Sequence, residues 1–150
     1  MSYIIGLDPG NEQSALVAFD GQCITDMRYG PNDEILCHLA ALPILTAYPL
    51  VIEKIASYGM PVGETVFETV FWSGRFAQAY GMERVHRITR IQVKSHLCHS
   101  AKAKDGNIRQ ALIDRFGAPG TKTAPGALYG VTGDLWSALA VAVTWWDQNV

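Results

Sequence analysis

Three acidic side chains lie where the sequence predicts that a strand ends or a helix begins. Asp8 follows the apolar run 3–7, Glu53 follows the run 50–52, and Asp134 comes directly before the run 135–146. Such positions gather at one rim of a sheet. Because Mg²⁺ prefers oxygen ligands, three converging carboxylates and a phosphate could hold one or two such ions. Two ions together would activate a water and stabilise the leaving oxygen, which is the chemistry of phosphodiester hydrolysis.

Each of these acids also has an ordinary structural interpretation. Asp8 precedes Pro9 and Gly10 and can cap a turn, Glu53 can form a salt bridge near Lys54, and Asp134 is a good N-cap residue for the helix that follows. Taken singly, each acid is weak support for a metal site. Their order along the chain, beside a basic segment, makes the metal site the stronger hypothesis.

The basic residues are concentrated in one part of the chain, although the formal net charge is −2. Seven of the twelve lie between positions 84 and 109, against a single acid, Asp105: Arg84, Arg87, Arg90, Lys94, Lys102, Lys104 and Arg109. A solvated helix surface is the ordinary explanation of such a run. Next to three candidate metal-binding carboxylates, the segment instead predicts contacts with nucleic-acid phosphates.

The elements that must position these residues follow from apolar periodicity and turn signals. We expect strands at 3–8, 15–19, 23–29, 50–53 and 85–88, and helical segments at 31–47, 63–81, 91–97, 107–116 and 135–146. Asp20-Gly21 predicts a two-residue hairpin turn. Pro43 predicts a kink or an early end of the first helix, and 118–133 is expected to be a loop. The order is mixed α/β, which a strictly alternating doubly wound nucleotide-binding fold would not give.

Composition and length set the broad class. A chain of 150 residues, with 49% hydrophobic and 17% charged residues, is expected to form one globular domain, 1–150. Its apolar runs are shorter than a membrane span requires, and no export signal is recognisable.

Cys23, Cys37 and Cys98 do not form a disulfide framework, which favours a cytoplasmic location. A zinc site that combines them with His38, His96 and His99 lacks the usual ligand spacing.

The sequence resembles the RuvC family of Holliday-junction resolvases, in particular its diverged phage-type members. The segments that carry the resemblance span nearly the whole chain: Ile5-Gly6-Leu7-Asp8-Pro9-Gly10, Val51-Ile52-Glu53, Gln92-Val93-Lys94, 101–107, and Gly133-Asp134-Leu135-Trp136-Ser137-Ala138-Leu139-Ala140. The resemblance implies a ribonuclease H-like α/β fold, with a mixed five-stranded sheet and helices on both faces. It also implies a homodimer that uses Mg²⁺ or Mn²⁺ to make paired nicks in four-way DNA junctions.

Carried over by motif, the resemblance makes Asp8, Glu53 and Asp134 metal ligands and places Lys94 and Lys104 near the scissile phosphate. Two departures from the family pattern matter. Ser137 stands where the family usually has a second acidic or histidine ligand on the last helix, so we expect weaker binding of one metal. The family's aromatic wedge after the strand-four glutamate is also missing at Ile55 and Ala56. Tyr58 is the nearest aromatic and could unstack a base, although an ordinary loop tyrosine explains it equally well.

The predicted helix 63–81 has an unusually wide apolar surface. Val66, Val70 and Ala77 form one stripe, and Phe67, Phe71 and Trp72 extend it, which predicts a dimer interface at or near this helix. The alternative is that Phe71 and Trp72 fill the core of the monomer.

Three functional alternatives accompany the resolvase hypothesis. A junction-binding protein of the same fold with little or no cleavage activity would also fit, because the fourth ligand is missing. A related endonuclease acting on flaps, forks or structured RNA would use the same carboxylates. An actin-like ATP-binding domain shares the Gly6-x-Asp8-x-Gly10 pattern but needs two such halves, for which 150 residues leave no room.

Overall fold

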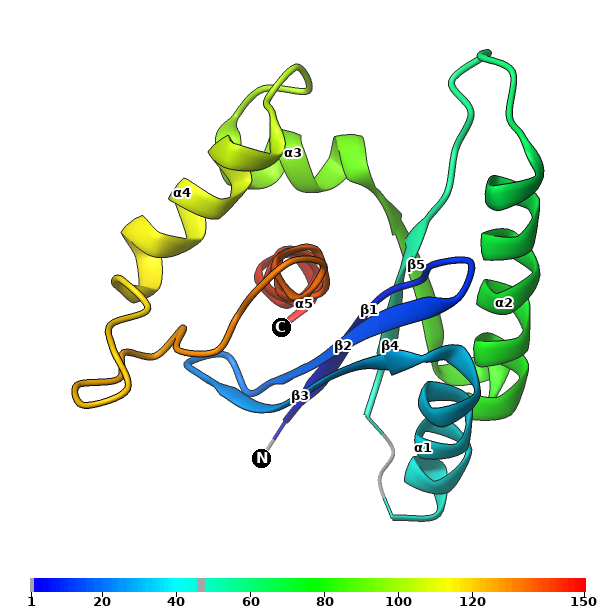
Figure 1. Ribbon diagram of the computed structural model, residues 1–150, viewed down its shortest axis with the longest axis horizontal. Helices are drawn as coiled ribbons and strands as arrows, with labels where there is room; N and C mark the ends of the chain where they lie inside the picture. The colour runs from blue at the N-terminus through cyan, green and yellow to red at the C-terminus, as the bar shows by residue number, and fades with distance from the viewer. Residues whose placement is uncertain (1, 46–47) are drawn as a thin grey trace.

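The computed structural model describes residues 2–45 and 48–150, and a mixed five-stranded sheet forms its centre (Figure 1). The strand order is β3-β2-β1-β4-β5, antiparallel among the first three and parallel from β1 through β4 to β5. The strands are β1 (Ile4–Asp8), β2 (Gln13–Phe19), β3 (Ile24–Pro31), β4 (Leu50–Lys54) and β5 (Val85–Thr89). The carboxyl ends of β1, β4 and β5 therefore meet at one edge of the sheet.

Helices cover both faces of this sheet, as predicted. One face carries α1 (Asn32–Leu45) and α2 (Glu64–Tyr80), and the other carries α5 (Leu135–Asn149), with α3 (Arg90–Cys98) and α4 (Asp105–Phe116) packed outside α5 (Figure 1). A short 3-10 helix, η1 (Met82–Arg84), precedes β5. Within the described residues, none of the helices is long and apolar enough to cross a membrane.

Successive side chains of β1 point to opposite faces of the sheet and therefore pack into two separate apolar cores. Ile5 and Leu7 pack with the α1 and α2 side, while Ile4 packs with the α5 side. Gly6 faces α5 at very close range: a Cβ there would collide with the carbonyl oxygen of Ala138 and lie 2.9 Å from the Cβ of Ala142. The small residue lets α5 approach the strand that carries Asp8.

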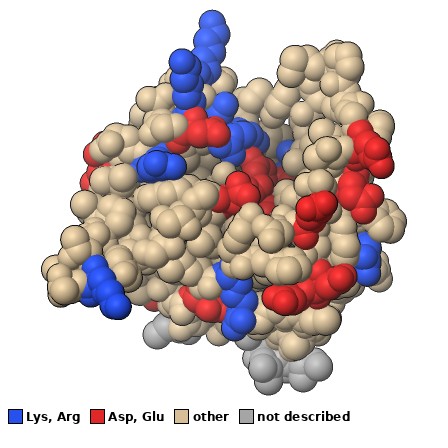
Figure 2. Space-filling view, in the orientation of Figure 1, with Lys and Arg blue, Asp and Glu red and all other residues tan. Residues whose placement is uncertain are grey.

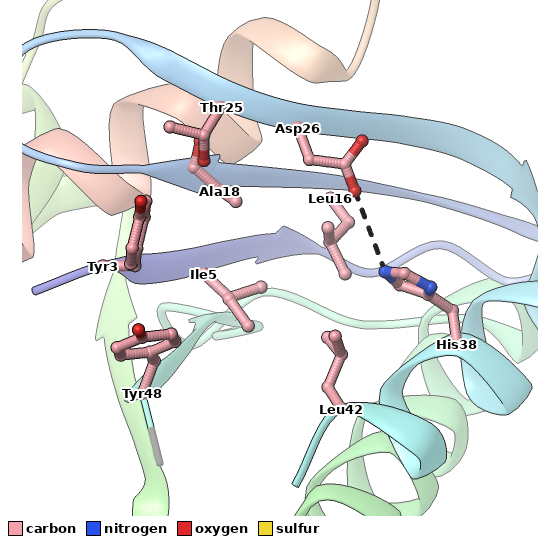
Figure 3. A pocket seen from close by; sticks show the side chains of 9 residues that line it. All are labelled: Tyr3, Ile5, Leu16, Ala18, Thr25, Asp26, His38, Leu42 and Tyr48. Carbon is pink, nitrogen blue, oxygen red and sulfur yellow. Dashed lines mark hydrogen bonds and ion pairs between the residues drawn. The ribbon is translucent and has the colours of Figure 1, made fainter. Parts of the chain in front are cut away.

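The α1 face holds a mostly apolar cavity of about 180 Å³ (Figure 3). It lies beside Ile5 and Leu16, and at its rim His38 of α1 faces Asp26 of β3 with 3.9 Å between Nε2 and Oδ2. Burial, and then the charge of Arg28, lowers the pKa of His38 against the opposing effect of Asp26. This cavity is on the sheet face opposite α5.

Two details differ from the expectations. The hairpin between β2 and β3 has a four-residue loop rather than a two-residue turn, because the Asp20 carboxylate accepts hydrogen bonds from the backbone N–H groups of Gln22 (2.9 Å) and Cys23 (2.8 Å). Helix α1 does not end at Pro43 but continues to Leu45, and positions 46–47 of the expected helix are outside the described residues. The other elements agree with the predicted ranges to within a few residues.

Helix α2 leaves part of its apolar surface in water. Phe67 and Phe71 are 64% and 61% exposed, and Val70 is 50% exposed. The alternative that Phe71 fills the core is therefore wrong. Trp72 is half-buried, packs against Phe76 and lies under the guanidinium of Arg75.

Candidate active site

The three predicted carboxylates line one hollow of about 340 Å³ at the carboxyl edge of the sheet. Asp8 is the last residue of β1, Glu53 is the penultimate residue of the adjacent parallel strand β4, and Asp134 directly precedes α5. Glu53 is only 6% exposed, Asp8 is half-buried and Asp134 is exposed. Figure 2 shows acidic atoms gathered in this central depression, with basic atoms beside them.

A buried hydrogen-bond network fixes the turn that follows Asp8. The Ser14 hydroxyl accepts a hydrogen bond from the Gly10 N–H (3.1 Å) and donates one to the Asn32 side chain (2.6 Å). Asn32 in turn donates to the Gly10 carbonyl (2.9 Å). Because Asn32 begins α1, this network joins the end of β1 to the helix and holds the Asp8 backbone in place.

Asp8 and Glu53 follow the paired residues Leu7 and Ile52 of the parallel strands β1 and β4, so their side chains lie on the same side of the sheet. Burial raises the pKa of Asp8 to about 9, with smaller contributions in the same direction from the charge and hydrogen bond of Glu53 and from the charge of Asp134. Arg90 opposes this shift. With this raised pKa the Asp8 carboxyl is protonated at neutral pH, and a bound cation could take the place of that proton.

These oxygen donors fit a hard divalent ion such as Mg²⁺ or Mn²⁺, which Asp8, Glu53 and Asp134 would hold. Within residues 2–45 and 48–150, however, no three His, Cys, Asp or Glu side chains are gathered closely enough to form a ready-made metal cluster. In the same part of the chain, the cysteines and histidines that were considered as zinc ligands also form no such cluster.

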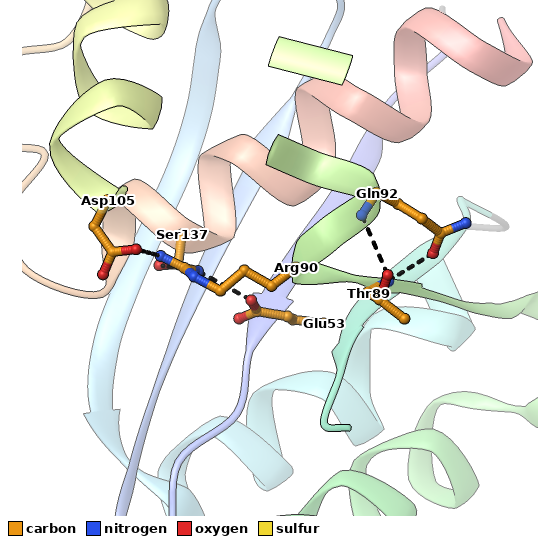
Figure 4. A network of polar contacts seen from close by, with 6 residues as sticks. All are labelled: Glu53, Thr89, Arg90, Gln92, Asp105 and Ser137. Atoms are coloured by element: carbon orange, nitrogen blue, oxygen red, sulfur yellow. Dashed lines mark hydrogen bonds and ion pairs between the residues drawn. The ribbon is translucent and has the colours of Figure 1, made fainter. Parts of the chain in front are cut away.

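Arg90 enters the carboxylate hollow, although the sequence grouped it with the DNA-binding cations (Figure 4). Its Nη1 lies 3.0 Å from Oε1 of Glu53 and 3.3 Å from Oγ of Ser137, and its Nη2 donates to Oδ1 of Asp105. The hydrogen bond from Arg90 holds the pKa of Asp105 below its usual value. Arg90 thus joins β4, α4 and α5 at the site.

Ser137 and Tyr58 also line the hollow. Ser137 is half-buried in the first turn of α5, where its hydroxyl can accept the hydrogen bond from Arg90. Tyr58 lies in the connection between β4 and α2, is 54% exposed, and has a positive φ of 50°. The structure therefore places Tyr58 at the hollow with its side chain open to solvent.

The other predicted cations do not line the hollow. Lys94 is half-buried on α3, one turn after Arg90, whereas Lys102 and Lys104 are exposed between α3 and α4. Arg109 is exposed on α4, with its guanidinium 5.3 Å from the ring centre of Trp136.

Arg87 and Arg84 lie further from the carboxylates along β5. Arg87 is exposed and lines, with Lys54, a neighbouring groove of about 540 Å³. Arg84 precedes β5 at the opposite end of the sheet, where it donates to the Tyr80 carbonyl (2.9 Å) and pairs with Glu83. The structure therefore does not bring Arg84 to the site.

Two charged residues of the hollow were not predicted as site residues. Lys54 follows Glu53 directly, and Asp105 begins α4. A signal for Asp105 was available, because it is the one acid in the basic segment 84–109.

The sheet order, the helices on both faces and the carboxylates at the carboxyl edge define an α/β fold of the ribonuclease H-like class. More particularly, the fold is that of RuvC. The structure of RuvC from Thermus thermophilus is similar, with a TM-score of 0.64 and 19% sequence identity over 95% of this chain and 92% of that chain. The structure of T. thermophilus RuvC in complex with a Holliday junction substrate gives a TM-score of 0.66 and 16% identity, covering 96% and 92% of the two chains. No family model and no curated protein matches the sequence.

Proposed function

We propose that this chain is a metal-dependent endonuclease that hydrolyses phosphodiester bonds in branched DNA and resolves four-way junctions by paired nicks. The observation that carries the proposal is the meeting of Asp8, Glu53 and Asp134 in one hollow of a RuvC-like fold. The complex of T. thermophilus RuvC with a Holliday junction supports branched DNA as the substrate class. In this proposal residues 1–150 form a single nuclease domain of the phage type.

The chain's own residues have distinct roles in the proposed reaction. Asp8, Glu53 and Asp134 would hold Mg²⁺ or Mn²⁺, with the Ser137 hydroxyl beside them. When bound, the cation supplies activation of the attacking water and stabilisation of the leaving 3′ oxygen. Lys94 and Lys104 would neutralise phosphate charge as compact point charges. The exposed Arg87, Lys102 and Arg109 would hold the DNA arms further out.

The proposal includes a homodimer in a cytoplasmic setting. A four-way junction has approximate two-fold symmetry, and paired nicks require two identical sites related by that symmetry. The exposed Phe67, Val70 and Phe71 of α2 supply an apolar surface that a second copy could cover. The free thiols of Cys23, Cys37 and Cys98 support a reducing compartment.

The test compares nicking of four-way, three-way, flap and linear duplex DNA at equal concentrations, with Mg²⁺ or Mn²⁺. We expect paired nicks in the four-way junction, lost in Asp8→Asn and retained in Asp33→Asn. Asp33 is a matched control because it is an exposed aspartate in the first turn of α1, outside the hollow. Preferred cutting of flaps would support the related endonuclease instead.

A junction-binding protein with little cleavage is the second candidate, and the position of Arg90 favours it. The Arg90 guanidinium already neutralises Glu53 in the hollow, so a metal must compete for that carboxylate. Tight junction binding with no nicks in either metal, for wild type and Asp8→Asn alike, would select this function.

A further inference from the structure

We propose that Arg90 is a resident cation of the carboxylate site and fills the place of one divalent ion, so that each site binds a single metal. This inference rests on the proposed nuclease function, because it concerns the metal content of the same hollow. It rests on three features: the contacts of Arg90, the way its side chain is fixed, and the charge of the hollow.

The contacts of Arg90 are those expected of a bridging cation. One terminal nitrogen lies between the buried Glu53 carboxylate (3.0 Å) and the Ser137 hydroxyl (3.3 Å), and the other donates to Asp105. These acceptors belong to β4, α5 and α4, so the guanidinium connects three elements at the point where Asp8 and Asp134 also lie. Figure 4 shows the side chain extended between Glu53 and Asp105, with Ser137 beside it.

Arg90 is held in this position by its local structure. Thr89 caps α3 by accepting a hydrogen bond from the Gln92 N–H (3.2 Å), and the Gln92 side chain accepts one from the Thr89 N–H (2.7 Å). This capping box fixes the backbone at Arg90, the first residue of α3. Asp105 then orients the planar guanidinium from its far side, and the side chain is only 29% exposed. A freely moving surface arginine would have none of these restraints.

The charge of the hollow leaves room for one divalent ion. Asp8, Glu53, Asp105 and Asp134 bring four negative charges when all are ionised, and Arg90 and Lys54 bring two positive charges. The difference is a formal charge of −2, which one divalent cation balances. In the absence of DNA phosphate, a second such ion would give a net positive site, and Ser137 offers it a neutral hydroxyl rather than a carboxylate.

The experiment counts bound Mn²⁺ without DNA, using calorimetry for the number of ions and electron paramagnetic resonance for coupling between neighbouring ions. We expect one Mn²⁺ per chain in the wild type and in Ser137→Asp, because Arg90 remains in both. The double variant Arg90→Gln with Ser137→Asp should bind two ions with a spin-coupled signal. Arg28→Gln is the matched control, since Arg28 is exposed on β3 and does not line the hollow, and it should bind one ion.

Two ions in the wild type, or one ion in the double variant, would overturn the inference. Arg90→Lys keeps the charge and should retain one ion even if Arg90→Gln proves unstable. A simple inhibitory role for Arg90 makes a different prediction: Arg90→Gln would cut junctions as fast as the wild type or faster. A resident cation predicts that cleavage falls about 100-fold at saturating Mn²⁺.

Failure of the two proposals can be told apart. If the wild type binds one Mn²⁺ but cuts no branched DNA, the nuclease function fails and the single-ion site stands. If the wild type cuts junctions and binds two ions, the nuclease function stands and the role of Arg90 is wrong.

Discussion

The Asp8 carboxyl keeps its proton at neutral pH because burial and the neighbouring Glu53 raise its pKa to about 9. A metal must displace this proton, so metal affinity should rise about tenfold per pH unit below pH 9. Calorimetric titration of Mn²⁺ at pH 7, in two buffers of different ionisation enthalpy, should detect one proton released per chain. Asp8→Asn should release none. Metal binding by the wild type with no proton release would contradict the raised pKa of Asp8.

The same residue makes the metal-free protein sensitive to high pH. Because the folded-state pKa of Asp8 is raised from 3.8, the native chain binds more protons than the unfolded chain between about pH 4 and pH 9, so stability falls as pH rises through this range. Urea unfolding with a chelator at pH 5, 7 and 8 should show this decline. Asp8→Asn should flatten it and leave the metal-free protein more stable than wild type at pH 8. An unchanged slope would remove Asp8 as its cause.

The sequence located the carboxylates but not their partners. Asp8, Glu53 and Asp134 could be predicted to meet because each lies at an element end, and parallel neighbours bring such ends together. Arg90 was grouped with the DNA-binding cations instead, because its local sequence gives no sign that its guanidinium contacts Glu53, Asp105 and Ser137. The local sequence around an arginine in a basic segment is the same whether its side chain contacts DNA or carboxylates of the same chain.

At the level of elements, the contact between β1 and α5 depends on Gly6. Gly6→Ala should destabilise the protein by about 2–4 kcal/mol, because its new methyl group would meet the Ala138 carbonyl and force β1 and α5 apart. Gly74→Ala is the control, since a methyl group there meets no atom within 4 Å on α2 and should stabilise that helix by about 1 kcal/mol. Equal effects of the two changes on urea unfolding would show that the close approach is unimportant.

Asp147 links the C-terminal end of α5 to α3 and α4 through its side chain. Its carboxylate accepts two hydrogen bonds from Arg115 (2.6 and 2.8 Å) and lies 2.8 Å from Nε2 of His96. Asp147→Asn should lower the free energy of unfolding by about 1 kcal/mol at pH 7. The effect is modest because the ion pair between Asp147 and Arg115 is partly exposed.

The hydrogen bond from Arg115, and to a smaller degree His96, lowers the pKa of Asp147. The stabilisation is therefore fully present above the unfolded value near 3.8 and is lost as pH falls through the lower folded value. The difference between wild type and Asp147→Asn should shrink in acid. Asp114→Asn, which alters an exposed contact with Gln110 on α4, provides the comparison.

The predicted elements were most accurate where one periodic pattern ran without interruption. Helix α2 lies between Gly63 and Gly81 as expected, and α5 begins directly after Asp134. The predicted ranges were wrong where another interaction outweighed the local sequence signal. The Asp20 side chain organises a longer hairpin loop than Asp20-Gly21 suggests, and α1 continues past Pro43 as it packs on α2 and the sheet.

For the whole molecule, charge is distributed unevenly around the acidic hollow. The cations Lys94, Lys102 and Lys104 lie on α3 and its connection to α4, between the hollow residues Arg90 and Asp105, and would attract DNA phosphates toward the site. Lys94→Ala and Lys104→Ala should each lower the slope of log affinity against log salt by about one unit for a four-way junction. Lys122→Ala, in the exposed loop before α5, should leave the slope unchanged. Unaltered affinity and cleavage in both test variants would exclude this surface.

Self-association would determine whether two such sites can act together on one junction. Phe67 and Phe71 are separated by one turn on the outer face of α2 and are both more than 60% exposed, so a two-fold partner could bury them against their own copies. Sedimentation at micromolar concentration should show a dimer near twice 16.4 kDa. Since burying each phenylalanine contributes about 1.5–3 kcal/mol, Phe67→Ser with Phe71→Ser should weaken the dimer about 100-fold or more. Tyr29→Ser, at a 53% exposed aromatic on β3, should not. A wild-type species that stays near 16.4 kDa on concentration would exclude the dimer, and paired nicking would then require two independent binding events.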